Sequence, residues 1–571
     1  MRGGPGAGEP GVASGAGRED RAALIALFAV WLVSTVMWIE PGIMIPDGAG
    51  YVVYLPSTYL DHDLLFFNEW QRLGLIRNGI PVFKSVAPTG YLGNHWTVGP
   101  SMLWYPAFIV SDVARNIVPA LRMFARDGIR LPYNLAVIAG SAFAGLGTLL
   151  IGYRVARRWF SASASWAAAI AIWFGTTLAW YSVRDAAMSH AASALACALV
   201  VLLSLRLRES PTTEAAFSAG LAVGFAALVR IQNAAFVIVP IVLLAVVDWR
   251  VLARRAHTFV AGGLLGVLPE LVVSSFIYGH PLGFASIGVR AIGWYPWTRF
   301  WGVETLFSWY HGLFSWTPLA AFGVIGVVLF WRLDRPLAAV GALSFVIQWI
   351  TNASADRAFW AANSFGARRF DNCTIFFLLG VATLIAKWPR IVIPIAAICC
   401  GWTMLLFLIA RRVDLNAYQN FGELVTAIRT NPLTSDFGVL VFVRSMRTVT
   451  LALLIVLLAV NVAIAAAILK ASARLRVIAA ACYFAVMTAF LAWCGINGSS
   501  RIERYSALIA RSRAFHASAG DEIGEENLLQ NELLYLRKSG RTAEAAADER
   551  ELHELFRRRA AAFRAAGVSA R

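Results

Sequence analysis

The sequence predicts an all-helical protein that crosses a membrane many times. Of its 571 residues, 58% are hydrophobic and only 15% are charged, and the mean hydropathy is +0.63. This balance is typical of polytopic membrane proteins and excludes an ordinary soluble domain. We predict about thirteen transmembrane helices, at residues 22–39, 134–153, 161–181, 188–205, 215–229, 233–248, 258–278, 313–331, 336–352, 372–388, 391–410, 448–469 and 475–494.

Positive charge sets the predicted orientation. The formal net charge is +17, and most arginines lie in short loops on one side of the predicted spans, as in the pairs Arg157/Arg158 and Arg254/Arg255. Such loops are cytoplasmic in membrane proteins, so the charge does not call for a nucleic-acid partner. The N-terminus is then cytoplasmic and the C-terminus lies outside. The alternation holds only if the apolar segment 99–117, which proline interrupts, lies at the membrane interface without crossing.

The predicted organisation has three parts. Residues 1–20 are rich in glycine and alanine and are expected to be a disordered cytoplasmic N-terminus. Residues 21–494 form the transmembrane domain, in which a long first outward loop covers 40–133. Residues 495–571 form a small outward helical tail, with a helix break at Gly540. Six cysteines are scattered without a CxxC motif, which indicates neither a zinc site nor a disulfide framework.

The first part of the outward loop carries carboxylates among many aromatic residues. Asp47 lies in the turn-forming string Pro46-Asp47-Gly48, just beyond the first span. A carboxylate there could take a proton from an incoming hydroxyl or amine. It could equally cap the helix-like segment that begins at Gly50, since aspartate is a favoured N-cap. Both interpretations stay open at this point.

Three more carboxylates follow at Asp61, Asp63 and Glu69. Carboxylates this close in sequence could bind a divalent cation or a polar substrate, whereas the simpler interpretation is a solvated acidic turn. We expect no metal. Lys84 and His95 supply positive or titratable groups later in the loop.

Arginines on the outward side run against the orientation rule and therefore call for another explanation. Arg368 and Arg369 precede one span, and Arg184 and Arg230 lie at the outward ends of two others. Arginine grips phosphate oxygens in a fork, so these residues predict a ring around an anionic lipid head group. Lipid contact or structural ion pairing is the alternative. His311 lies in an aromatic-rich loop that could simply be an interfacial belt.

Two ionisable residues inside apolar runs have structural interpretations. Glu270 follows Pro269 within a predicted span and is expected to be a buried, paired group. His190, in the string MSHAASALA, is expected to be a hydrogen-bonded core histidine.

Several strings together resemble the membrane-embedded glycosyltransferases of the GT-C fold. They are DGAGYVVYLPSTYLDHDLLFFNEW, PTGYLGNHWTVGPSMLWYPAF, ALVRIQN, YHGLFSWTPL and SFGARRF. The resemblance covers roughly residues 22–410 and is greatest to bacterial relatives of the protein mannosyltransferases and of the lipid A aminoarabinose transferase. It implies transfer of a sugar from a polyprenyl-phosphate donor to a glycan, lipid or protein acceptor on the outer face of a bacterial inner membrane.

The resemblance also implies roles for individual residues. Asp47 falls on the position of the base, and the donor phosphate would be bound by Arg368, Arg369, Lys84, His95 and Arg230. Tyr51, Asp61, Asp63, Glu69, Arg184 and His311 would line the substrate site. Many relatives have Asp-Glu where this chain has Asp47-Gly48, which puts metal participation in doubt, and no cofactor is expected. Relatives carry a lysine before a Pro-Pro helix, where this chain has Asn94-His95-Trp96, so His95 or Lys84 would replace that charge.

Two other classes of protein compete with this interpretation. A transporter or lipid flippase would also be polytopic, but such proteins often contain internal repeats. We find no repeat of fixed period, and the polar residues gather on one side. A non-catalytic scaffold for envelope assembly, docking through the tail, is the third possibility.

Overall fold

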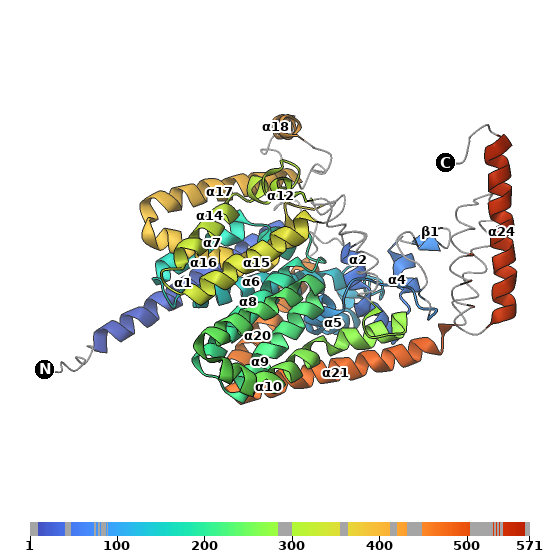
Figure 1. The fold of residues 1–571 in the computed structure, drawn as a ribbon, viewed down its shortest axis with the longest axis horizontal. Helices are drawn as coiled ribbons and strands as arrows, with labels where there is room; N and C mark the ends of the chain where they lie inside the picture. The colour runs from blue at the N-terminus through green and yellow to red at the C-terminus, as the bar shows by residue number, and fades with distance from the viewer. Residues whose placement is uncertain are drawn as a thin grey trace.

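The computed structural model describes residues 10–39, 47–73, 76–77, 80–81, 87, 89–283, 300–354, 364–410, 420–430, 448–502, 529, 533, 536 and 541–565. Within them the chain is a bundle of helices, which confirms the predicted class (Figure 1). The one exception is a short antiparallel pair, β1 (Ile76–Arg77) with β2 (Ile80–Pro81).

The elements follow one another in this order: α1 (Pro10–Trp38), α2 (Asp47–Val52), α3 (Tyr54–Pro56), η1 (Ser57–Asp61), α4 (Phe67–Arg72), β1, β2, α5 (Gly99–Ile117), η2 (Pro119–Leu121), α6 (Tyr133–Ala156), α7 (Ala162–Gly175), η3 (Trp180–Arg184), α8 (His190–Glu209), α9 (Thr213–Val229), η4 (Ile231–Val237), α10 (Ile238–Tyr278), α12 (Gly302–Phe307), α13 (Leu313–Trp316), α14 (Leu319–Phe330), α15 (Arg335–Ala353), η6 (Arg368–Cys373), α16 (Thr374–Lys387), α17 (Pro389–Ala410), α18 (Phe421–Thr430), α20 (Thr448–Lys470), α21 (Ala473–Ser499) and α24 (Thr542–Ala565).

The chain is a multi-pass membrane protein. Nine helices of the described residues are long and apolar enough to cross a membrane. Four shorter apolar helices, at Ala162–Gly175, Thr213–Val229, Ile231–Leu244 and Leu319–Phe330, coincide with the four remaining predicted runs. Helix α5 is not among these candidates, although it is continuous over 19 residues with Pro106 inside it.

Three predicted boundaries were wrong. Helix α1 begins at Pro10, so the disorder predicted for residues 1–20 does not cover their second half. Asp20 fixes this extension, since it accepts hydrogen bonds from Arg157 at 2.6 Å and Tyr153 at 2.5 Å. The run predicted at 161–181 forms a helix only to Gly175 before the chain turns into η3. Pro318, which has no backbone N–H, separates α13 from α14 within the run predicted at 313–331.

Helix α10 covers two predicted spans and lies along α9 with both of its halves. Leu244 belongs to a small apolar cluster with Leu207 and Ala216, and Phe259 packs against the same cluster. In a straight helix Leu244 and Phe259 would lie ~22 Å apart, so the chain must bend back between them. This bend gives the two antiparallel passes that the sequence predicts.

The segment after α1 and the tail lie towards the same end of the molecule. In Figure 1, α4 and β1 lie between the helix bundle and α24, on the side opposite the N-terminus, and α2 lies next to the bundle. Arg501, just after α21, donates to the Asp61 carbonyl at 2.8 Å, and Tyr91 donates to the Gly495 carbonyl at 2.5 Å. These bonds fix the loop to the end of α21. The tail is helical over Thr542–Ala565, as predicted.

Candidate functional site

The predicted base and a predicted phosphate ligand form an ion pair. Arg368 Nη2 lies 2.9 Å from Asp47 Oδ2, although 321 residues separate them. Asp47 begins α2 and Arg368 begins η6. The Arg368 side chain is 10% exposed and that of Asp47 is 32% exposed. The arginine is therefore nearly buried, whereas the carboxylate can be reached by solvent.

Helix α2 is held in place by the segment that leads into α5. Asn94 Nδ2 donates to the Gly50 carbonyl at 2.8 Å, and Ser101 Oγ donates to the Tyr51 carbonyl. The Trp96 ring lies so close to Gly50 that a Cβ there would collide with it. Only glycine permits this approach, so the position of Asp47 depends on the residue three places after it.

Tyr51 lies one helical turn after Asp47, on the same side of α2. Its hydroxyl accepts a hydrogen bond from Ser189 at 3.0 Å and is almost fully buried. Burial raises the pKa of Tyr51, and the nearby Arg230 offsets only part of this rise. The phenol is therefore protonated at neutral pH and can hydrogen-bond to a substrate oxygen.

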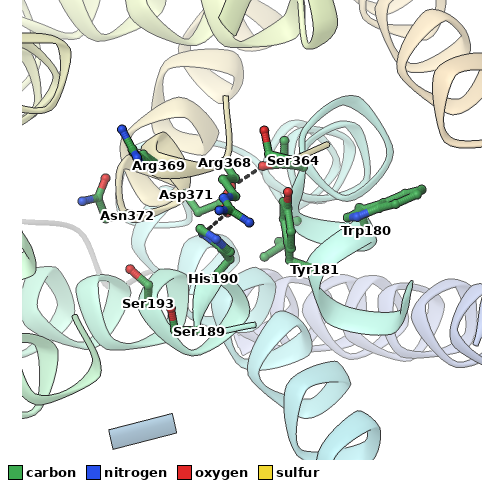
Figure 2. Close-up of polar contacts among 12 residues, drawn as sticks. Trp180, Tyr181, Ser189, His190, Ser193, Ser364, Arg368, Arg369, Asp371 and Asn372 are labelled. Carbon is green, nitrogen blue, oxygen red and sulfur yellow. Dashed lines mark hydrogen bonds and ion pairs between the residues drawn. The ribbon is translucent and has the colours of Figure 1, made fainter. Parts of the chain in front are cut away.

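A buried polar network lies beside this ion pair (Figure 2). His190 Nδ1 is 2.7 Å from Arg230 Nη1 and 3.1 Å from Asp371 Oδ2. The other oxygen of Asp371 accepts a hydrogen bond from Thr177. His190 and Asp371 are only 3% and 4% exposed, so the network belongs to the interior of the bundle.

An amide layer ties the network to neighbouring helices. Asn233 Nδ2 donates to Ser193 at 2.9 Å, and Asn372 Nδ2 donates to Asn233 Oδ1 at 3.2 Å. Gln232 Nε2 donates to the Arg369 carbonyl at 3.1 Å. These bonds join α8, η4 and η6, so the arginines of η6 have a fixed backbone.

Two of the carboxylates predicted to line the substrate site have partners within the protein. Asp63 accepts hydrogen bonds from Ser57 and from the Leu65 backbone, each at 3.1 Å, and pairs with Arg501 at 3.1 Å. Asp61 accepts from Asn68 at 2.7 Å. Both therefore stabilise the folded loop. A substrate role for them stays a prediction.

Glu69 is also remote from solvent, with 0% of its surface exposed. Burial, and then the nearby Asp61 carboxylate, raise the pKa of Glu69 well above its usual range.

Within the described part of the chain, no group of three histidine, cysteine or acidic side chains could hold a metal ion.

The remaining predicted residues are spread around the site. The Arg184 guanidinium lies 5.6 Å from the Trp180 ring centroid, and Trp180 donates to Asp185 at 2.6 Å. His311 is buried, with a positive φ of 64°, and lies 4.3 Å from the Trp316 ring.

Two further candidates lie in the first outward loop. His95 is exposed and stacks on Trp96 at 3.9 Å. Lys84 lies outside the described residues.

Sequence reasoning missed two members of the network and the site role of a third. His190 is buried and bonded, as predicted, but its partners are charged residues of the site. Asp371 and Thr177 were not singled out. For His190 and Asp371 the available signal was their position, because MSHAAS and RRFDN place a histidine and an acid at the predicted outward end of an apolar run.

The arrangement can bind an anion next to a carboxylate. Three arginines interact with His190 through their charge: Arg230, Arg368 and Arg369. Two carboxylates lie among them, with Asp47 paired to Arg368 and Asp371 next to His190. No protein-family model matches the sequence, and no curated protein matches it. The GT-C resemblance therefore rests on the sequence motifs alone.

Proposed function

We propose that the protein is a glycosyltransferase of the GT-C type. It would move a sugar from a polyprenyl-phosphate donor to a glycan, lipid or protein acceptor. The observation that carries the proposal is the meeting of Asp47 and Arg368 at 2.9 Å. A transferase of this kind needs a base and a phosphate ligand side by side, and this chain supplies both from distant segments.

The chemistry assigns one role to each side of the pair. The donor phosphate binds Arg368 and displaces Asp47, which is then free to accept a proton from the acceptor hydroxyl. The acceptor oxygen attacks the anomeric carbon while the bond from that carbon to the phosphate oxygen breaks. Polyprenyl phosphate leaves with the bonding electrons, and the arginines stabilise its negative charge.

The proposed setting is the outer face of a bacterial inner membrane. All thirteen apolar helices would cross it, with the N-terminus in the cytoplasm and both the long loop and the tail in the periplasm. The location of the loop and the tail at one end of the molecule supports this arrangement (Figure 1).

A transporter or lipid flippase is the alternative, since it could use the same arginines to bind a lipid phosphate. Only an enzyme releases polyprenyl phosphate from the donor. We would therefore incubate the purified protein with a polyprenyl-phosphate sugar and candidate acceptors and measure both donor binding and release of the free lipid phosphate. Binding without release under every acceptor condition would favour the transporter.

The test of the phosphate ligand is Arg368→Ala. Loss of a charge-assisted contact should weaken donor binding roughly ten- to a hundred-fold. The matched control is Arg122→Ala, because Arg122 is exposed and its side chain donates to the Asn116 carbonyl at 3.0 Å, just after η2. Equal donor affinity in both variants would place the phosphate elsewhere.

A further inference from the structure

The two arginines nearest the centre of the site are held in chemically different ways. Arg368 is paired with the Asp47 carboxylate. Arg230 instead donates to neutral acceptors, His190 Nδ1 at 2.7 Å and Gln232 Oε1 at 3.3 Å. Among the ion pairs of the described residues, none includes Arg230.

A neutral acceptor orients a guanidinium without cancelling its charge. Arginine is always protonated and can only donate hydrogen bonds. The contact from Arg230 therefore requires a lone pair on His190 Nδ1. One nitrogen cannot accept from Arg230 and donate to Asp371 at once, so the observed contact at 2.7 Å corresponds to an unprotonated Nδ1. Among the described residues no carboxylate pairs directly with Arg230, so its positive charge can attract another anion.

The surroundings of His190 fix the ring in this position. The ring packs on that of Tyr181, with 4.4 Å between centroids. Asp371 faces Nδ1 at 3.1 Å and is itself bonded by Thr177. A histidine that is 3% exposed and held from several elements is well suited to orient its neighbour.

We propose that Arg230 is a ligand of the donor phosphate and that His190 is the residue that positions it, acting as a neutral acceptor. This rests on the proposed function, because it assigns the anion as the phosphate of the polyprenyl donor. His190 touches no reacting atom in this scheme. Its part is to hold the Arg230 guanidinium at a fixed angle while leaving its charge available.

The test compares three replacements of His190. His190→Asn keeps a neutral oxygen acceptor near the place of Nδ1, His190→Asp has the same shape but a negative charge, and His190→Ala has no acceptor. We would measure binding of a polyprenyl phosphate in detergent micelles, with the corresponding polyprenol, which lacks the phosphate, as the reference ligand.

The expected order separates positioning from packing. His190→Asn should bind within about threefold of the wild type, whereas His190→Ala should bind about tenfold more weakly, since a charged contact loses its orientation. His190→Asp should bind at least as weakly as His190→Ala, because a carboxylate neutralises Arg230 while holding it. Polyprenol binding should be the same in all three. If His190→Asp does not yield a monodisperse protein, the Asn and Ala variants decide the question.

A double-mutant cycle with Arg230→Ala completes the experiment. Once Arg230 is absent, the Asn and Ala variants of His190 should bind polyprenyl phosphate equally. Wild-type affinity in Arg230→Ala, or equal affinity of the Asn and Ala variants with Arg230 present, would overturn the inference and leave the proposed function standing. A wild-type protein that binds polyprenol and polyprenyl phosphate alike would overturn the proposed function itself.

Discussion

Asp47 is the residue on which the proposed chemistry depends most. In Asp47→Asn the helix start should survive, because asparagine and aspartate are comparable caps. The base is lost, which should slow transfer about 100- to 10,000-fold. Donor binding should be unchanged or tighter, since Arg368 loses the carboxylate that lies 2.9 Å away. Transfer assays and donor-binding isotherms on the same preparation would measure both effects.

The result that would remove Asp47 from the mechanism is a folded Asn variant with near-normal turnover. Asp127→Asn is a suitable control, because Asp127 is a carboxylate that accepts hydrogen bonds from the backbone of Ile129 and Arg130 in the turn before α6. It should transfer at the wild-type rate.

Glu69 predicts a pH dependence of stability. Its pKa is raised in the folded protein by burial and by Asp61, so the protonated form is the one that folding favours. Below about pH 4, the ordinary pKa of a free glutamate, Glu69 is protonated in both the folded and the unfolded protein and does not change the free energy of unfolding. Above this pH the free energy of unfolding falls by at most about 1.4 kcal/mol per pH unit, until the pH reaches the raised pKa of the folded protein. Glu69→Gln should therefore melt higher than the wild type, and by more at pH 8 than at pH 5.

Melting curves in detergent at the two pH values would check this, with Glu214→Gln as the control, since Glu214 is exposed. A constant difference between wild type and Glu69→Gln at both pH values would contradict the buried, protonated state of Glu69.

For single residues, the sequence predicted candidate site residues more readily than it predicted which residues they contact. Asp47 and Arg368 stood out because each lies at the outward end of an apolar run. Nothing local to Asp63 reveals its partner Arg501, which lies 438 residues further along the chain. A carboxylate looks the same in a sequence whether its neighbour is a substrate or a distant arginine.

At the scale of elements, glycine determines how closely α9 and α10 approach. A Cβ at Gly220 would collide with the Phe259 carbonyl, and one at Gly224 with the Gly263 carbonyl. Small residues allow such contact between membrane helices. Gly220→Ala should destabilise the protein by about 1–3 kcal/mol through overpacking. The melting temperature in detergent is the measurement.

Gly401 in α17 is the matched control, because nothing lies within 4 Å of a Cβ there. Gly401→Ala should leave the protein unchanged or slightly more stable, since alanine favours helix. Equal destabilisation by both substitutions would show that backbone propensity, and not contact with α10, sets the effect.

Hydropathy predicted where helices lie but not where they are interrupted. The end of α7 at Gly175 was missed because residues 176–181 remain apolar enough to continue a span. The helix ends where a tertiary contact forms, because Thr177, two residues after Gly175, donates a hydrogen bond to the Asp371 carboxylate. The bend in α10 was predicted correctly because Arg254 and Arg255 mark it in the sequence.

For the whole molecule, the arrangement of helices predicts a topology. Reporter fusions after residues 160, 256 and 334 should be cytoplasmic, and a fusion at the C-terminus should be external. The reason is that each short loop at these positions is basic and thirteen crossings are odd in number. A cytoplasmic C-terminus would show that one of the four short apolar helices does not cross, or that α5 does.

The separation of 321 residues between Asp47 and Arg368 has a consequence for biosynthesis. A ribosome that adds ~5–20 residues per second needs ~16–64 s to produce the arginine after the aspartate. Under the proposed topology and function, the new α2 segment stays outside the membrane without its partner during this time. Nascent chains cut short before η6 would hold the carboxylate but none of the arginines of η6, so they would lack these ligands of the donor phosphate. Activity would then begin only after most of the chain has been inserted.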